Sequence, residues 1–196
     1  MARPRVLAFA GSTRTESFNR RLLAAAVRVA GQQDLDVDHI ELADYPMPIF
    51  DQDLEAEHGQ DPNATKLRRK LERADGLMLA CPEYNSSITP LMKNVIDWVS
   101  RSEHGGSGVE IYAGKKALLL GASPGRLGGR RSVATVRSIL GNIGVDVLDA
   151  EVTLPRAHDA LDENGGLVDA GQREHLASTV RAFALFLRGE TPLNPS

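Results

Sequence analysis

Short apolar runs alternate with longer amphipathic segments along most of this 196-residue sequence. The first run, residues 6–10, is Val-Leu-Ala-Phe-Ala, and the segment after it has a 3.6-residue apolar period formed by Leu22, Leu23, Ala26, Val27 and Ala30. The run is typical of a buried strand, and the period is typical of a helix with one apolar face. Repeated strand–helix alternation predicts an α/β domain with a mostly parallel sheet and helices on both faces.

Five strands are predicted in this way, at residues 6–10, about 37–42, 77–81, 117–120 and about 146–152. The later helices are predicted around 67–74, at about 90–101, at about 129–143 and around 176–187. The stretch 45–61 is rich in proline and aspartate, and it is predicted to be a long loop.

The charged residues within the predicted strands indicate the order of the strands in the sheet. The first, third and fourth strands are continuously apolar, as strands covered on both faces are. The other two have charged interiors, with Asp38, His39 and Glu41 in the second and Asp146 and Asp149 in the fifth. The order 2-1-3-4-5 places these two strands at the edges. The sequence therefore predicts a flavodoxin-like three-layer sandwich with a five-stranded parallel sheet.

Length and composition fit a single domain over residues 1–196. Hydrophobic residues make up 42% and charged residues 25%, which excludes a disordered chain. The net charge of −3 is spread along the sequence and indicates neither a nucleic-acid groove nor a membrane surface. The single cysteine, Cys81, is expected to be a packed core thiol, and the histidines have no metal-ligand spacing. Without a predicted signal peptide or membrane span, we expect a cytoplasmic protein.

In a sheet of this order, ligands bind beyond the carboxyl ends of the strands. The loop after the first strand, residues 11–19, opens a helix, whose free N–H groups and dipole attract an anion. The polar side chains of this loop are those of Ser12, Thr13, Arg14, Ser17 and Asn19. Such donors can surround a phosphate, whereas an ordinary helix cap at Ser17 or Asn19 would need neither Arg14 nor so many hydroxyls. The loop therefore predicts a phosphate-bearing cofactor.

The loops after the third and fourth strands carry weaker signals. Residues 82–90 have the sequence Pro-Glu-Tyr-Asn-Ser-Ser-Ile-Thr-Pro, in which backbone N–H groups could meet the edge of a flat heterocycle and Tyr84 could pack on its face. The alternative interpretation is a tight strand-to-helix turn with Thr89 as N-cap before Pro90, and both can hold together. Residues 123–130 contain three glycines, which permit close approach of a ligand or serve geometry alone.

Together these loops resemble those of the NADPH-dependent FMN reductase family of flavodoxin-like proteins, which includes FMN-containing quinone, azo-dye and chromate reductases. The matching motifs are Gly-Ser-x-Arg-x-x-Ser-x-Asn at 11–19, Pro-Glu-Tyr-Asn at 82–85, Lys-Asn-x-x-Asp-Trp-x-Ser-Arg at 93–101 and Ser-x-Gly-x-x-Gly-Gly at 123–129. The resemblance extends from about Arg5 to Ile143. The chain departs from many relatives at residues 89–92, where a proline is displaced by one position and a glycine is missing.

The resemblance implies FMN as the bound cofactor and NADPH, or NADH, as the hydride donor. The phosphate of FMN would be held at the first loop by Ser12, Arg14, Ser17, Phe18 and Asn19. The isoalloxazine would be lined by Pro82, Glu83, Tyr84 and Asn85, and the same pocket would be bordered by Ser123, Gly125 and Gly128. Relatives build the active site between two subunits, so a homodimer or a dimer of dimers is expected.

The implied reaction transfers a hydride from NAD(P)H to the flavin N5 and then reduces FMN, a quinone or a similar small electron acceptor. It needs no protein nucleophile, and no catalytic residue is assigned. The alternative function is that of a passive FMN electron carrier of the flavodoxin type. The net charge of −3 and the presence of Arg14 argue against this alternative.

Several charged residues leave two interpretations open. Arg126, Arg130 and Arg131 are compatible with a site for the 2′-phosphate of NADPH and equally with a solvated basic patch. Asp97 and Arg101 lie four residues apart on a predicted helix, so they are expected to form a surface ion pair or to serve at a dimer interface. Glu83 is interpreted as a hydrogen-bonding residue of its loop.

Overall fold

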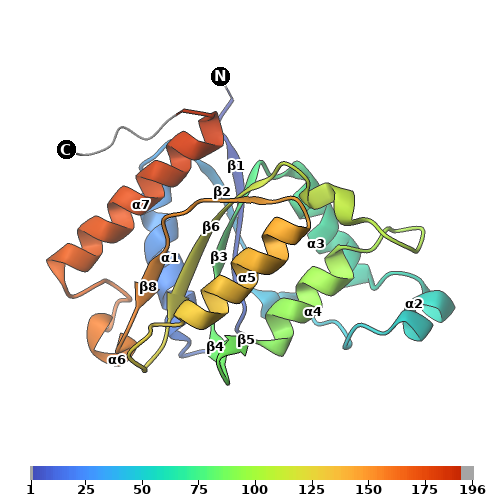
Figure 1. Ribbon diagram of the computed structural model, residues 1–196, viewed down its shortest axis with the longest axis horizontal. Helices are drawn as coiled ribbons and strands as arrows, with labels where there is room; N and C mark the ends of the chain where they lie inside the picture. The colour runs from blue at the N-terminus through green and yellow to red at the C-terminus, as the bar shows by residue number, and fades with distance from the viewer. Residues whose placement is uncertain (1, 191–196) are drawn as a thin grey trace.

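The computed structural model describes residues 2–190, which form one parallel sheet between two layers of helices (Figure 1). The sheet strands are β1 Arg5–Ala10, β2 Asp36–His39, β3 Gly76–Ala80, β6 Lys116–Ala122, β7 Asp146–Val147 and β8 Val152–Leu154. Their order is β2-β1-β3-β6-β7, with β8 also paired with β6, and all of these pairs are parallel. The flavodoxin-like order is confirmed, with β2 at one edge and β7 and β8 at the other.

The strand predicted at about 146–152 is two short strands separated by a bulge. Between their pairings with β6, Ala117 opposite Val147 and Leu120 opposite Val152, β6 has fewer residues than its partner. The Arg137 guanidinium fills the bulge by donating hydrogen bonds to the carbonyl oxygens of Leu148 (2.9 Å) and Asp149 (3.3 Å). The extra residues thus keep hydrogen-bond partners without lying in the ladder.

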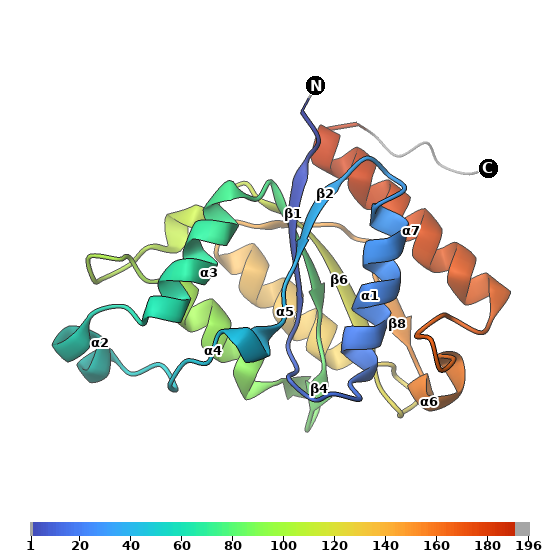
Figure 2. The ribbon, with the colours of Figure 1, turned by 180° about the vertical axis from the view of Figure 1, so that it is seen from behind.

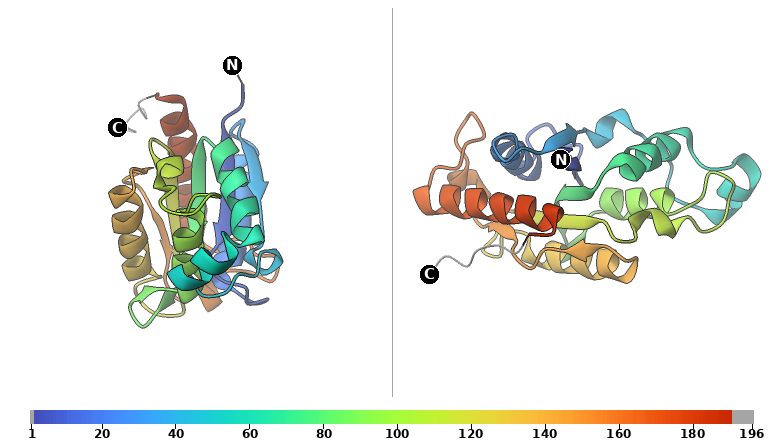
Figure 3. Two further views of the ribbon diagram at one scale, coloured as in Figure 1. Left: turned by 90° about the vertical axis from the view of Figure 1, so that its right-hand side faces the viewer. Right: turned by 90° about the horizontal axis from the view of Figure 1, so that it is seen from above.

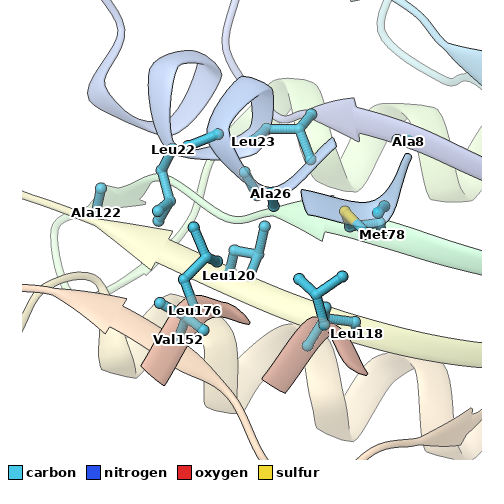
Figure 4. Packing of buried hydrophobic residues seen from close by; sticks show 14 of the residues in the cluster. Ala8, Leu22, Leu23, Ala26, Met78, Leu118, Leu120, Ala122, Val152 and Leu176 are labelled. Atoms are coloured by element: carbon cyan, nitrogen blue, oxygen red, sulfur yellow. The ribbon is translucent and has the colours of Figure 1, made fainter. Parts of the chain in front are cut away.

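The long helices are α1 Phe18–Ala30, α3 Pro62–Arg73, α4 Pro90–Val99, α5 Arg130–Asn142 and α7 Ala170–Arg188, and α6 spans Ala157–Ala160. Alternate residues of the central strands face opposite layers, so Ala8 packs with α1 and α7 whereas Leu7 packs with α3, α4 and α5. Figure 4 shows Leu22, Leu23 and Ala26 of α1 directed at side chains of the central strands. This double coverage explains the continuously apolar sequences of β1, β3 and β6.

The stretch 45–61, predicted to be a long loop, contains the helix α2 Gln52–His58 and is preceded by a 3₁₀ turn, η1 Leu42–Asp44. The side chain of Asp51 caps α2 by accepting hydrogen bonds from the backbone N–H groups of Asp53 and Leu54. The one buried residue of α2 is Glu55, so this helix has no apolar period for the sequence to display. Figure 3 (right) shows this segment, in cyan, projecting beyond the helical layers on the side away from α7.

Because the strands are parallel, the loops after β1, β3 and β6 lie at the same edge of the sheet. Figure 2 shows the loop that joins β1 to α1 beside β4 at this edge, at the bottom of the view. The loop after β3 contains a small hairpin, β4 Glu83–Tyr84 paired with β5 Ser87–Ile88. Among the described helices, none has both the length and the apolar character needed to cross a membrane.

Candidate functional site

The first loop is seated against the start of α4 by Gly11. The Gly11 N–H donates to the carbonyl of Ala80 (2.9 Å), and its carbonyl accepts from the Thr89 hydroxyl (2.8 Å). A Cβ at this position would lie 3.0 Å from the Met92 side chain. Glycine therefore allows residues 11–19 to pack closely on the segment that follows β3.

Two buried serines of the first loop have hydroxyl groups directed by their backbone neighbours. Ser17 is the N-cap of α1, and its Oγ accepts from the backbone N–H of Arg20 (3.4 Å). The Oγ of Ser12 accepts from the N–H of Arg14 (3.3 Å). Within residues 2–190, neither hydroxyl donates a hydrogen bond to a protein group, although both serines are buried. Both hydroxyl hydrogens are thus available to an acceptor such as a phosphate oxygen.

Arg14 and the first turn of α1 add positive potential beside these serines. The Arg14 side chain is exposed, and its guanidinium has no hydrogen-bond or ion-pair partner among residues 2–190. The carbonyl of Arg14 is fixed by Arg20, whose Nη1 donates to it (2.9 Å). The N–H groups of Phe18 and Asn19 lie in the first turn of α1, where no helical carbonyl precedes them.

Asn19 uses its side chain differently from the expectation of a direct phosphate ligand. Its amide Nδ2 donates to the carbonyl of Ala122 (2.8 Å), and its Oδ1 accepts from the N–H of Ala122 (3.0 Å). The side chain is buried and joins α1 to the end of β6. Of the hydrogen-bond donors of Asn19, only the backbone N–H remains at the amino terminus of α1, where an anion would bind.

The second loop is the β4–β5 hairpin, which the sequence did not predict. Its two turn residues, Asn85 and Ser86, have φ angles of 51° and 67°, as a two-residue type I′ turn requires. Thr89 caps α4 by accepting from the N–H of Met92 (3.2 Å), which confirms it as the N-cap. Tyr84 is 50% exposed, so its ring stands at the surface beside the site.

The hairpin is tied to the amino terminus of α5. The carboxylate of Glu83 accepts from the backbone N–H of Arg131 (3.1 Å) and lies 3.5 Å from its guanidinium. The same guanidinium donates to Ser86 Oγ (2.9 Å), and the Ser132 hydroxyl donates to the carbonyl of Pro82 (2.8 Å). Glu83 is thus a hydrogen-bonding residue of its loop, as expected, and the favourable charge at a helix terminus adds to the contact.

The third loop, residues 123–130, lies between the hairpin and β8. At Gly128, with φ of 59°, an added Cβ would lie 2.7 Å from the backbone of Leu154 and Pro155. The close approach that this glycine permits is therefore to the protein's own chain. A Cβ at Gly125 would meet only Ser123 Oγ at 3.6 Å, so the Cα of Gly125 borders open space.

A cleft of about 550 Å³ lies between the second and third loops. Its lining residues are Glu83, Ser123, Gly125, Arg126, Leu127 and Arg131. This volume is within the range of small-molecule sites, roughly 300–1,000 Å³. Three of the predicted site residues, Glu83, Ser123 and Gly125, thus line one cleft.

The three arginines of this region have different partners. Arg131 is held by Glu83 and Ser86, and the Arg130 guanidinium lies 3.7 Å from the Glu151 carboxylate. Arg126 has no ion-pair or hydrogen-bond partner among residues 2–190, and it lines the cleft. The three arginines form one group in the sequence because they are close together in the chain. The glutamates that distinguish them, Glu83 and Glu151, are distant in sequence.

The motif at 93–101 holds the segment that leads into α2, a role that the sequence did not reveal. Asn94 accepts from the N–H of Phe50 (2.7 Å), and both Asn94 and Trp98 donate to the carbonyl of Pro48 (2.8 Å each). Arg101 makes a bidentate ion pair with the buried carboxylate of Glu55. The expected pairing of Arg101 with Asp97 is wrong.

Asp97 instead pairs with Lys93, one helical turn earlier, with an Nζ–Oδ1 distance of 2.7 Å. Arg101 follows the end of α4, where the chain has left the helical path, and its guanidinium is turned toward α2. The hydrogen bonds that Arg101 donates to Glu55 raise the pKa of the Arg101 guanidinium, so this side chain stays charged.

Cys81 lies at the end of β3, completely buried, which confirms it as a core thiol. Burial raises the pKa of the Cys81 thiol far above its usual range, so the reactive thiolate is suppressed. Among residues 2–190, no group of three His, Cys, Asp or Glu side chains is placed to hold a metal ion.

The sequence and the fold of this chain are similar to those of known proteins. The family model described as NADPH-dependent FMN reductase matches residues 4–159. An NAD(P)H-dependent FMN reductase of Pseudomonas aeruginosa is 35% identical over 188 residues, covering 94% of this chain and 95% of that protein. An NADPH:quinone oxidoreductase of Arabidopsis thaliana is 31% identical over 194 residues, covering 95% and 94%.

Among solved structures, a flavoenzyme NAD(P)H:(acceptor) oxidoreductase from Paracoccus denitrificans superposes with a TM-score of 0.81. The two sequences are 24% identical, and the match covers 95% of this chain and 98% of that one. This likeness supports the fold.

Proposed function

We propose that a quinone or similar small molecule is the electron acceptor of this protein. The chain belongs to the NADPH-dependent FMN reductase family and is an NAD(P)H-dependent flavin oxidoreductase. The observation that carries the assignment is the family match over residues 4–159, which includes all three loops at the carboxyl edge of the sheet. Relatives from plants and bacteria that are named for quinones support the choice of acceptor.

The chemistry of the first loop fits the phosphate of FMN. Two buried serine hydroxyls each retain a hydrogen to donate. The Arg14 guanidinium has no partner among the described residues, so it can pair with a bound anion. We therefore infer that Ser12, Arg14 and Ser17 hold the phosphate, with the first-turn N–H groups of Phe18 and Asn19. A passive carrier of the flavodoxin type has no corresponding support in the family match.

The second and third loops would hold the ring. Tyr84 and Asn85 belong to the hairpin that Glu83 fixes to α5, and Pro82 directly precedes it. Ser123 and Gly125 line the cleft together with Glu83. Gly128 shapes the third loop through its contact with β8. FMN, when bound, supplies the redox chemistry by taking reducing equivalents from NAD(P)H and passing them to the acceptor. The protein binds and orients the flavin and leaves one ring face open, which requires no nucleophilic side chain.

The phosphate assignment is tested by comparing FMN with riboflavin, which lacks the phosphate. Charge-assisted hydrogen bonds contribute roughly 1.5–3 kcal/mol each, so Arg14→Ala should weaken FMN binding roughly ten- to hundred-fold. Riboflavin binding should be unchanged. Fluorescence-quenching titrations of the apoprotein measure both affinities. A variant that purifies with a full complement of FMN contradicts the assignment.

We also propose that the chain acts as one domain in the cytoplasm and as a homodimer or dimer of dimers. Ile49, 75% exposed, supports a protein contact because it stands on the projecting segment that Asn94 and Trp98 hold in place. Light scattering of the FMN-loaded protein tests this, and a monomer at micromolar concentration contradicts it.

A further inference from the structure

One pair of hydrogen bonds joins the first loop, residues 11–19, to the end of β6, the strand that precedes the third loop. Because the first loop is the proposed phosphate site, it is called the phosphate loop. The Asn19 amide meets both backbone polar groups of Ala122, at 2.8 Å and 3.0 Å, across 103 residues of sequence. Both residues are buried, with exposed fractions of 4% and 3%. Buried, two-point contacts of this kind fix orientation as well as distance.

This contact lies between the two halves of the proposed flavin site. Asn19 follows the capping Ser17 by two residues in α1, and Ala122 directly precedes Ser123, which lines the cleft. Among the described residues, the hydrogen bonds that join residues 11–19 to residues 121–130 are the two made by Asn19.

The other anchors of the two loops lead elsewhere in the fold. Gly11 binds Ala80 and Thr89, on the side of β3 and α4. Ser123 exchanges hydrogen bonds with Leu154 and Ala157, on the side of β8 and α6. Beyond the strand ladder that both loops share, the Asn19 amide is therefore their direct hydrogen-bonded link.

We propose that Asn19 is a positioning residue that holds the phosphate loop and the third loop in register, so that it sets the affinity for the whole flavin. This inference rests on the proposed FMN site. It differs from direct ligation, in which the Asn19 side chain would contribute only to phosphate binding. It also differs from a purely structural role, in which the side chain would contribute to folding stability alone.

The test compares Asn19→Leu with Arg14→Ala in titrations with FMN and riboflavin. Leucine has a similar size but cannot make either hydrogen bond to Ala122. We expect Asn19→Leu to weaken both flavins by a similar factor, about tenfold or more. Arg14→Ala is the matched control in the same loop, and it should weaken FMN alone.

Two results overturn the proposal. If Asn19→Leu weakens FMN but leaves riboflavin unchanged, the side chain acts on the phosphate. If it lowers the thermal midpoint but leaves both affinities unchanged well below that midpoint, its role is structural. Failure of the wild-type protein to bind FMN would instead contradict the proposed function.

Asn19→Asp keeps the experiment decisive if the leucine variant does not fold. A carboxylate can still accept from the Ala122 N–H, but it cannot donate to the Ala122 carbonyl. Riboflavin carries no phosphate, so the added charge does not repel it directly. We expect weaker riboflavin binding, and an unchanged affinity overturns the proposal.

Discussion

Arg126 is the residue through which the proposed site could distinguish NADPH from NADH. Its neighbours Arg130 and Arg131 are paired with Glu151 and Glu83, whereas Arg126 lines the cleft without a partner among residues 2–190. A free guanidinium at the cleft is suited to an additional phosphate.

We expect Arg126→Ala to raise the KM for NADPH roughly tenfold and to leave the KM for NADH unchanged, because one charge-assisted contact is lost. Arg130→Ala is the control, since its guanidinium already faces Glu151. Steady-state kinetics with both nicotinamides measure the effect. An unchanged ratio of the two KM values would assign Arg126 to the solvated surface.

At the residue scale, the sequence was sufficient where the partner is local. Thr89 is the helix cap that the sequence suggested, and Ser17 has the capping role that was weighed as the alternative to phosphate binding; each accepts from a backbone N–H three residues away. Asn19 and Gly128 were assigned to the cofactor, but their contacts are with Ala122 and Leu154, which become neighbours only in the folded sheet. No local pattern predicts such contacts.

At the scale of elements, α4 anchors the segment that contains α2. Arg101 reaches the buried Glu55 carboxylate with hydrogen bonds of 2.8–3.0 Å and also lies 5.6 Å from the centre of the Phe50 ring. Phe50 packs edge-on against Trp98 with ring centroids 5.0 Å apart. This cluster explains how a helix with no apolar face stays attached.

We expect Arg101→Ala to reduce the free energy of unfolding by about 2–4 kcal/mol, because it leaves the Glu55 carboxylate buried without its partner. Lys93→Ala should cost less than about 1 kcal/mol, because the Lys93–Asp97 pair on the same helix is exposed. Urea denaturation measures both, and hydrogen exchange should show the loss of protection concentrated in residues 48–58. Equal effects of the two substitutions would contradict this account.

The central elements of the sheet were predictable because burial on both faces leaves a continuous apolar run. The elements that escaped prediction are those stabilised by polar contacts. The two turns of α2 bury a glutamate, the β4–β5 hairpin turns on Asn85 and Ser86, and the β7–β8 bulge is filled by Arg137. None of these interactions is apolar, so hydrophobic periodicity does not display them.

At the scale of the whole molecule, parallel strand order brings three loops to one edge, where each supplies a different part of the site. The first offers hydroxyl and cationic donors, the second a hairpin fixed to α5, and the third an open backbone beside the cleft. The family match explains why these loops occur together in one chain. The sequence predicted this convergence because strand order alone determines it.

The most direct test of the central claim is anaerobic reduction of the FMN-loaded protein by NADPH and by NADH, followed by addition of a quinone. We expect the visible absorbance of the oxidised flavin to bleach with at least one nicotinamide and to return with the quinone. A protein that binds FMN but is reduced by neither nicotinamide would be an electron carrier, which contradicts the assignment as a reductase.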